Sequence, residues 1–278
     1  MGRLWYNVCN CIILYIIQTF SAFLKRKGGP FMRYQIEYSC VSHIGRVRSM
    51  NQDNFICNGT FALPNDNSLS YPLNGTLDLT QPYLFGVFDG MGGEECGEMA
   101  SYIAAKEASI LPLTQDAVSL MNAHTRDANL AICQYVADNG LSSMGTTSAM
   151  LLFDKKEITL CNVGDSKIYY LGKNGLEQIS TDHVAVAPYG RKPPLSQNLG
   201  IPPEWLQLEP FFAKGDYKIG DRYLICSDGL TDMVTPEEIG ELMATVPVAE
   251  LATLLTNRSL ENGGRDNITI IVIEIQKK

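Results

Sequence analysis

Short apolar runs separated by polar turns dominate the chain from residue 83 onward. Tyr83–Phe88 (YLFGVF) has the length and the aromatic content of a buried strand. Polar turns, such as DKKE at 154–157 and GKNG at 172–175, join several later runs directly, and such short connections favour antiparallel pairing. Further strands are expected at residues 146–153, 157–163, 167–171, 176–179, 222–227 and 268–275.

Helical stretches come in two consecutive pairs, and this order decides the expected fold class. The first pair is expected at 94–110 and 115–139, where Gly140 can end the second helix. The second pair is expected at about 236–245 and 248–260. Because helices do not alternate with every strand, the pattern favours an α+β layered fold over a doubly wound parallel sheet. Residues 58–81, rich in Asn, Pro, Leu, Ser and Gly, are predicted to form an extended loop. Glu94, Glu95 and Glu98 favour the start of the first helix.

The first 31 residues differ from the rest and form a hydrophobic leader. Residues 8–24 are mostly apolar and are followed by the basic cluster Lys25, Arg26 and Lys27. A run of about 17 residues is at the lower limit for spanning a bilayer, and the basic cluster would keep the following domain at the cytoplasmic face. No small-residue cleavage pattern of a signal peptide follows the run. Two interpretations stay open: a membrane anchor, or a true start at Met32. In both, residues 32–278 are one domain.

Composition removes several classes of function. The chain of 278 residues has a formal net charge of −8, so it lacks the basic surface that nucleic acid requires. Its eight cysteines are scattered without a C-x-x-C pair, which is typical of a reduced, cytoplasmic protein. With three histidines, a histidine-rich zinc site is excluded. Any metal would depend on oxygen ligands, which suit magnesium and manganese.

Aspartates recur where apolar strands begin or end. The positions are Asp89 before Gly90, Asp165 after Gly164, Asp228 before Gly229, and Asp266 before the last strand. A single Asp-Gly pair usually marks a turn. The same arrangement beside four different strands is harder to explain in this way, and converging carboxylates repel one another unless a cation lies among them. The pattern therefore suggests a metal site and assigns no reaction to it.

Five segments resemble the PPM family, the type 2C metal-dependent serine/threonine phosphatases, over about residues 34–275. They are RSMNQD (48–53), VFDGMGG (87–93), GTTSAMLLF (145–153) with NVGDSKIYYL (162–171), CSDGLTDMV (226–234) and GGRDNITIIVI (263–273). Each segment alone is a weak signal, but five in the family's order at similar spacing are specific. DGMGG and NQD are similar to the bacterial branch of the family.

The resemblance implies an α-β-β-α sandwich of two antiparallel sheets flanked by helices. It implies hydrolysis of phosphoserine and phosphothreonine in proteins by a hydroxide that bridges two Mn²⁺ or Mg²⁺ ions, with a weaker third ion also expected. Asp89 would bridge both ions, and Gly90 would offer its carbonyl oxygen to one of them. Asp228 and Asp266 would hold the other ion.

The same resemblance implies roles for four more residues. Asp53 would act through metal-bound water, whereas Asp165 and Asp232 match positions that bind the weaker third ion. Arg48 would bind the substrate phosphate, for which its planar guanidinium is suited.

The chain departs from the family pattern at three places. Met91 stands where many relatives carry a histidine proposed as a general acid, and a thioether cannot protonate a leaving group. Gln52 replaces a glutamate of some relatives. The flap before the Asn-Leu-Gly turn is short, at residues 184–200, and carries Arg191 and Lys192. We expect this short flap to alter substrate choice and to weaken the third metal site, and we expect a structural role for His183.

Two other functions stay open from the sequence. One is a non-catalytic module of the same fold that binds phosphoproteins, and the other is a two-metal hydrolase of nucleotides or small phosphoesters. Carboxylate clusters occur in many hydrolases, so the aspartates alone do not exclude the second function. The sequence has no GxxxxGK[ST] phosphate loop. The expected partners are phosphorylated proteins, the substrates of a serine/threonine kinase.

Overall fold

The structure is a computed structural model that describes residues 34–64, 68, 69, 71–91, 96–155, 157–187 and 192–278. The hydrophobic leader at 1–31, with its expected membrane tether at 8–24, lies outside the described residues, as do Glu94, Glu95 and Arg191. Within the described ranges, no helix combines the length and the apolar character needed to cross a bilayer.

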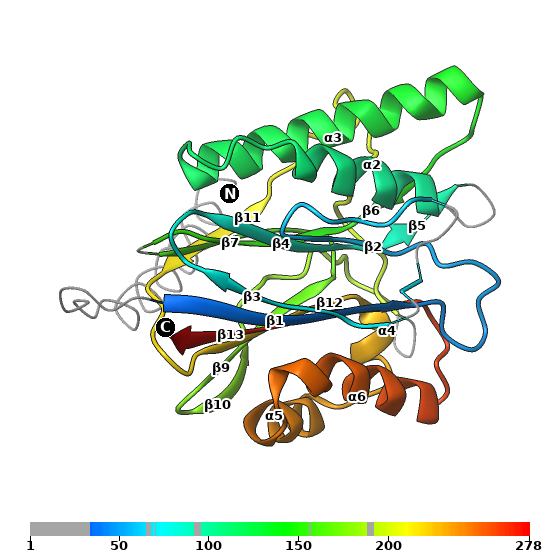
Figure 1. Ribbon diagram of the computed structural model, residues 1–278. Coiled ribbons are helices and arrows are strands. Elements are labelled where there is room, and N and C mark those ends of the chain that lie inside the picture. Colours follow the sequence, from blue (N-terminus) through cyan, green and yellow to red (C-terminus); the bar gives the residue numbers. More distant parts are fainter. Residues whose placement is uncertain (1–33, 65–67, 70, 92–95, 156, 188–191) are drawn as a thin grey trace, which may run out of the picture.

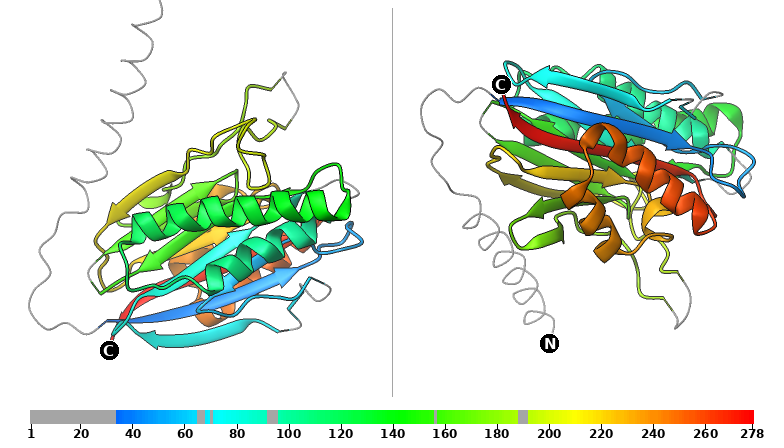
Figure 2. Two further views of the ribbon diagram at one scale, coloured as in Figure 1. Left: turned by 90° about the horizontal axis from the view of Figure 1, so that it is seen from above. Right: turned by 60° about the horizontal axis from the view of Figure 1, so that its bottom comes forward.

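Two antiparallel sheets lie face to face between two layers of helices, which confirms the predicted α-β-β-α sandwich (Figures 1 and 2). Helices α2 and α3 cover the outer face of one sheet, and α5 and α6 cover the outer face of the other (Figure 1). The helices are α2 (Gly97–Ser109), α3 (Ala117–Asn139), α4 (Asp228–Thr231), α5 (Pro236–Thr245) and α6 (Val248–Glu261).

The six-stranded sheet is built around a long pair of strands from opposite ends of the domain. Its order is β10 (Gly175–Gln178), β9 (Lys167–Gly172), β12 (Arg222–Cys226), β13 (Ile268–Lys277), β1 (Tyr34–His43) and β3 (Leu73–Asp78). Strands β1 and β13 pair along their whole length, from Tyr34 opposite Lys277 to His43 opposite Ile268. The start and the end of the domain therefore hold each other in the middle of the sheet.

The five-stranded sheet contains the first predicted strand, β4 (Tyr83–Phe88), between β7 (Ser148–Phe153) and the edge strand β2 (Asn54–Cys57). Its order is β11 (Phe211–Gly215), β8 (Ile158–Val163), β7, β4 and β2. A short pair, β5 (Gly90–Met91) and β6 (Gly145–Thr146), continues from this sheet at one edge. Strand β5 follows β4 and β6 precedes β7, so this pair extends the pairing of β4 with β7 at the edge of the sandwich.

Strand β4 shows why its sequence is an unbroken apolar run. Phe85 and Val87 face the core between the two sheets, whereas Leu84 and Phe88 face the core beneath α2 and α3. A strand that is buried on both faces has no polar alternation. Each such side chain contributes about 1.5–3 kcal/mol by leaving water, so β4 anchors both apolar layers.

Local signals explain the ends of two helices. Asp116 caps α3 by accepting a hydrogen bond from the Ser119 amide at 2.9 Å, and Gly140 ends the helix with a φ of 64°. Thr235 caps α5, in which Pro236 occupies the first position. The predicted helices at 115–139 and 236–245 therefore begin and end close to where the sequence placed them.

One prediction about the fold is wrong. Residues 58–81 are not one extended loop, because Leu73–Asp78 within them forms β3 and pairs with β1 at the edge of the six-stranded sheet. Gly75 allows this pairing, since a Cβ there would lie 2.5 Å from the Tyr38 hydroxyl. Strand β3 is half exposed, so its sequence lacks the apolar signal of the central strands.

Candidate functional site

A pocket of about 380 Å³ opens at one edge of the sandwich and collects most of the residues singled out in the sequence. Asp53 lies beneath it, and Asp232 joins it through a contact with Lys192. The pocket is lined by Arg48, Gln52, Asp89, Gly90, Met91, Asp165, Lys192, Pro193, Leu195, Asp228 and Asp266.

Strand direction explains why four aspartates meet at this edge. Strands β4 and β8 both pair antiparallel with β7, so they run in the same direction and end at the same edge, followed by Asp89 and Asp165. In the other sheet β12 and β13 are antiparallel, so the end of β12 lies beside the start of β13. Asp228 follows the first of these positions and Asp266 precedes the second. Rigid strands thus present the four carboxylates to one pocket.

Close backbone packing fixes the segment that carries Asp89. The Asp89 amide donates to Thr147 Oγ1 at 2.9 Å, and the Thr147 amide donates to the Asp89 carbonyl oxygen at 2.9 Å. The next residue, Gly90, has no room for a side chain, because a Cβ would lie 2.3 Å from the carbonyl oxygens of Gln52 and Gly97. The glycine of the Asp-Gly pair is therefore required for packing at the pocket floor.

Asp53 is buried beneath the pocket, with 1% of its surface exposed. Its carboxylate accepts a hydrogen bond from Ser227 Oγ at 2.7 Å, and Ser227 Oγ accepts one from the Thr269 amide at 3.0 Å. Burial raises the pKa of Asp53 to about 7, and the nearby charges of Asp228 and Asp266 add to the rise, while the hydrogen bonds oppose it. Asp53 thus joins the first segment of the domain to the end of β12.

Asp89 experiences the negative charge of the whole cluster. Burial raises its pKa well above the usual value, and repulsion from Asp228, Asp53, Asp165 and Asp266 raises it further. Among the described residues, no hydrogen bond to the Asp89 carboxylate forms. Burial likewise raises the pKa values of Asp165 and Asp228. The site as it stands holds more negative charge than its neighbours balance.

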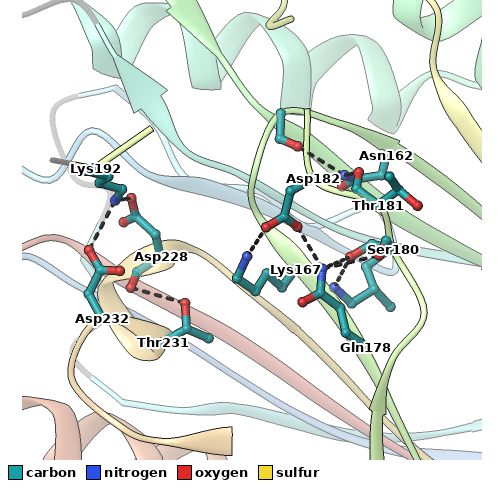
Figure 3. A network of polar contacts seen from close by, with 12 residues as sticks. Asn162, Lys167, Gln178, Ser180, Thr181, Asp182, Lys192, Asp228, Thr231 and Asp232 are labelled. Carbon is teal, nitrogen blue, oxygen red and sulfur yellow. Dashed lines mark hydrogen bonds and ion pairs between the residues drawn. The ribbon is translucent and has the colours of Figure 1, made fainter. Parts of the chain in front are cut away.

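Two cations contact the carboxylates of the pocket. Arg48 Nη2 lies 2.7 Å from Asp266 Oδ2, and this hydrogen bond raises the pKa of the arginine. Lys192 Nζ donates to Asp228 Oδ2 and, at 3.1 Å, to Asp232 Oδ2, as Figure 3 shows. Each basic side chain is about half exposed at the mouth of the pocket.

The carboxylates of the pocket suit a metal ion in their chemistry but are engaged by basic side chains. In the parts of the chain that the structure describes, no three histidine, cysteine, aspartate or glutamate side chains are arranged closely enough to hold a metal ion. Lys192 and Arg48 instead hold Asp228 and Asp266. The donor set nevertheless fits a hard divalent cation, because it consists of carboxylate oxygens with unbalanced negative charge. Binding would require the two basic side chains to release these carboxylates.

The short flap is tied down on both arms. The Ala185 amide donates to the Pro194 carbonyl oxygen, and the Ser196 amide donates to the His183 carbonyl oxygen, both at 2.8 Å. His183 also holds Gly164, since its amide donates to the Gly164 carbonyl oxygen at 2.9 Å and its Nδ1 accepts from the Gly164 amide at 3.2 Å. These contacts fit the predicted structural role of His183. They hold Pro194 and Ser196, which follow Lys192 in the chain, against the residues around His183.

The sequence analysis did not identify Asn267 and Ser227, whose hydrogen bonds hold the segments of the site together. Asn267 binds the opposite loop, because its Oδ1 accepts from the Gln52 amide at 2.8 Å and its Nδ2 donates to the carbonyl oxygens of Ile44 and Met50, each at 2.9 Å. Ser227 orients Asp53 in the same way. The sequence did carry one signal for these two residues: Asn267 follows Asp266, and Ser227 precedes Asp228. A polar residue next to a site carboxylate is well placed to orient a second loop.

Comparisons with known proteins identify one family to which the sequence is similar. The family model of protein phosphatase 2C matches residues 45–188. The serine/threonine protein phosphatase PstP of Mycobacterium tuberculosis is 34% identical over 207 residues, which cover 69% of this chain and 40% of PstP. The chain thus spans less than half of that relative. The serine/threonine phosphatase stp of Listeria welshimeri is 29% identical over 250 residues, covering 83% of this chain and 92% of stp.

Solved structures show the same fold. The catalytic domain of PstP in complex with two manganese ions is 30% identical, with a TM-score of 0.70, over 88% of this chain and 100% of that chain. PppA, described as a regulatory component of the type VI secretion system of Pseudomonas aeruginosa, is 25% identical, with a TM-score of 0.70, over 86% of this chain and 97% of that chain.

Proposed function

The chain belongs to the protein phosphatase 2C family, and from this premise we propose that it hydrolyses phosphoserine and phosphothreonine in proteins with two divalent metal ions. One observation carries the proposal: four aspartates from the ends of four strands line one pocket with Arg48. The PstP catalytic domain, which shares the fold, was solved with two manganese ions. Mn²⁺ and Mg²⁺ both suit these oxygen ligands.

The metal ions would lie among Asp89, the Gly90 carbonyl oxygen, Asp228 and Asp266. Bound there, they would supply an activated water and offset the charge of the phosphate. Asp53, buried below, would act through a water molecule. Asp165 and Asp232 would hold the weaker third ion. These assignments rest on the family motifs, and the shared pocket and the charge excess of its carboxylates support them.

The chain's own residues would orient the substrate. Arg48 can turn from Asp266 to two phosphate oxygens, because its side chain is half exposed and its planar fork matches an oxyanion. Met91 lines the pocket but carries no acidic proton, so the leaving oxygen would take its proton from water. The strands beneath hold Asp89 and Asp165 in place while the substrate binds.

Substrate comparison tests the proposal. The full chain is assayed with phosphoserine peptides, nucleoside triphosphates and p-nitrophenyl phosphate, with Mn²⁺ and with a chelator. We expect metal-dependent phosphate release that favours the phosphopeptides. Phosphopeptide binding that survives chelation without any turnover would point instead to a binding module. Higher kcat/KM for nucleotides would favour a hydrolase of small phosphoesters.

The proposal extends to location and partners. We infer a cytoplasmic enzyme acting on proteins phosphorylated by a serine/threonine kinase, tethered to the inner face of the membrane if residues 8–24 form an anchor. Membrane fractionation of the full chain against a chain that starts at Met32 tests the tether. Equal distribution of the two chains would contradict it.

Removal of Lys192 should strengthen metal binding. Its ammonium group holds Asp228 and Asp232 and therefore competes with a divalent ion for the same oxygens. We expect Lys192→Gln to lower the dissociation constant for Mn²⁺ by about three- to fivefold, within the range of a partly exposed ion pair. The effect should be largest at the weaker third site. Isothermal titration calorimetry of the metal-free protein measures it.

Lys214→Gln is the matched control for this change. Lys214 also contacts two carboxylates, Glu157 at 3.2 Å and Asp116 at 3.6 Å, but away from the pocket. Its replacement should leave the affinity for Mn²⁺ unchanged. Equal affinities of the Lys192 variant and the unmodified chain would show that the flap lysine does not compete with metal.

A further inference from the structure

A second and larger cavity adjoins the carboxylate pocket. It has a volume of about 820 Å³ and lies between α3 and the segment 198–205. Met91 lines both cavities, so the two cavities are neighbours that share this residue. We call this second cavity the Trp205 groove, because Trp205 stands at its border with 78% of its surface exposed.

Hydrogen bonds hold the groove open. Asn129 of α3 ties down the segment, since its Nδ2 donates to the Ile201 carbonyl oxygen at 2.9 Å and its Oδ1 accepts from the Gly200 amide at 2.6 Å. The Trp205 amide donates to the Pro202 carbonyl oxygen at 2.9 Å, which closes a turn over residues 202–205. The groove is therefore built into the chain and does not need a ligand to form it.

The chemistry of the groove differs from that of the pocket. Its walls include Met91, Leu130, Met144, Ile201 and Trp205. Among the described residues that line it, Glu204 is the one that carries a charge. Leu130 is 47% exposed, so with Trp205 it presents apolar surface to the solvent. Such walls fit apolar side chains, and Glu204 would repel an acidic one.

We propose that the Trp205 groove binds the polypeptide segment of the substrate next to its phosphorylated residue, and that it selects apolar side chains there. The inference rests on the proposed function. When a phosphoserine lies in the carboxylate pocket, the substrate peptide on either side of it must run along the surface next to that pocket. Met91 marks one exit, and the groove beyond it offers exposed indole and leucine surface for an extended segment.

Kinetics on two substrates separate this role from a structural one. p-Nitrophenyl phosphate has no peptide segment, whereas a phosphoserine peptide with flanking Leu or Phe residues can fill the groove. We expect Trp205→Ala to reduce the ratio of kcat/KM for the peptide to kcat/KM for p-nitrophenyl phosphate by roughly tenfold, mainly through KM. A peptide with flanking glutamates should be poorer than the apolar peptide with the unmodified chain.

Tyr71→Ala is the matched control, because Tyr71 is 84% exposed and lies before β3 of the other sheet. It should leave the ratio unchanged. An unchanged ratio in the Trp205 variant, or an equal loss on both substrates, would overturn the proposal. A preference for the glutamate peptide would overturn it as well.

A binding measurement judges the groove without turnover. The chain has two tryptophans, Trp5 and Trp205, so Trp5→Phe leaves Trp205 as the sole tryptophan emitter. In a full chain that also carries Asp89→Asn, we expect the apolar phosphopeptide to shift the emission of Trp205, and the glutamate peptide to do so only at higher concentration. No shift at saturating peptide would overturn the proposal, as would a shift on dilution of the protein alone, which would place a second copy in the groove. Absence of turnover in the unmodified chain would count against the proposed function and leave this test intact.

Discussion

Asp89→Asn should reduce metal-dependent phosphopeptide hydrolysis by roughly a thousandfold or more in kcat/KM, a loss of about 4 kcal/mol in transition-state stabilisation. Asp89 lies at the centre of the cluster, where it experiences the charges of Asp53, Asp165, Asp228 and Asp266. An amide has the same shape, but it is neutral and offers a single oxygen. Initial rates over a titration of Mn²⁺ measure the loss, and excess metal should not restore the rate.

Thermal unfolding in a chelator distinguishes this result from misfolding. Removal of one charge from repelling carboxylates should make the metal-free variant at least as stable as the unmodified chain. Burial raises the pKa of Asp53 to about 7 and also raises the pKa of Asp89. The folded metal-free chain therefore loses stability as the pH rises from the ordinary carboxyl pKa toward 7 and above. The gain from Asp89→Asn should therefore be larger at pH 8 than at pH 5. Glu177→Gln, on the exposed strand β10, should change neither the rate of hydrolysis nor the stability of the metal-free chain. Full activity of the Asp89 variant would remove the basis of the proposed function.

Strand β4, which is buried on both faces, was predictable from the sequence, whereas β1, β2, β3 and β11 were not. Strand β4 is apolar at nearly every position because it separates two cores. Strand β1 mixes Ile36 and Cys40 with the buried Ser39 and Ser42, so its sequence gives neither a continuous nor an alternating apolar pattern. Strands β3 and β11 lie at sheet edges, and β2 has four residues. For these strands tertiary pairing outweighs local pattern.

The positions of the site aspartates were predictable because strand ends carry a local signal. The aspartates follow or precede apolar runs, and the antiparallel sheets bring those ends together at one edge. Their contacts were not predictable in the same way. Lys192 meets Asp228 from 36 positions away, and Arg48 meets Asp266 from 218 positions away. Such pairs depend on the packing of the whole domain.

The Trp205 groove shows the same limit. Four separate parts of the chain build it: Met91, α3, the residues around Met144, and the segment 198–205. No local pattern in these parts signals an apolar binding surface. A single exposed tryptophan does not indicate a binding surface. The cavity beside Trp205 does, and it forms only when the folded chain brings α3 and the segment 198–205 together.

The two segments that carry Asp228 and Asp266 approach each other very closely at Gly229. A Cβ on Gly229 would lie 1.9 Å from the Asn267 carbonyl oxygen and 2.9 Å from its carbonyl carbon, and both are backbone atoms that cannot turn aside. Ser259 Oγ donates to the Gly229 carbonyl oxygen at 2.7 Å and holds this turn against α6. The contact therefore sets the separation between two of the proposed metal ligands.

Gly229→Ala should accordingly damage both stability and metal binding. We expect the free energy of unfolding to fall by roughly 2–3 kcal/mol, as for overpacked sites, because one of the two segments must move. That displacement separates Asp228 from Asp266, so affinity for Mn²⁺ should fall about tenfold or more. Urea unfolding of the metal-free chain and calorimetric titration with Mn²⁺ measure the two effects independently.

Gly240→Ala provides the comparison for this last change. Gly240 lies within α5, and a Cβ there would meet one neighbouring atom, Leu176 Cβ, at 3.2 Å. Alanine is also a better helix former than glycine, by about 1 kcal/mol. The free energy of unfolding of the Gly240→Ala variant should therefore change little or rise. If Gly229→Ala were as stable and bound Mn²⁺ as tightly as Gly240→Ala, the close approach of the two loops would not control the spacing of the carboxylates. A loss confined to Gly229→Ala would show that the metal affinity of this edge depends on how closely the two backbones pack.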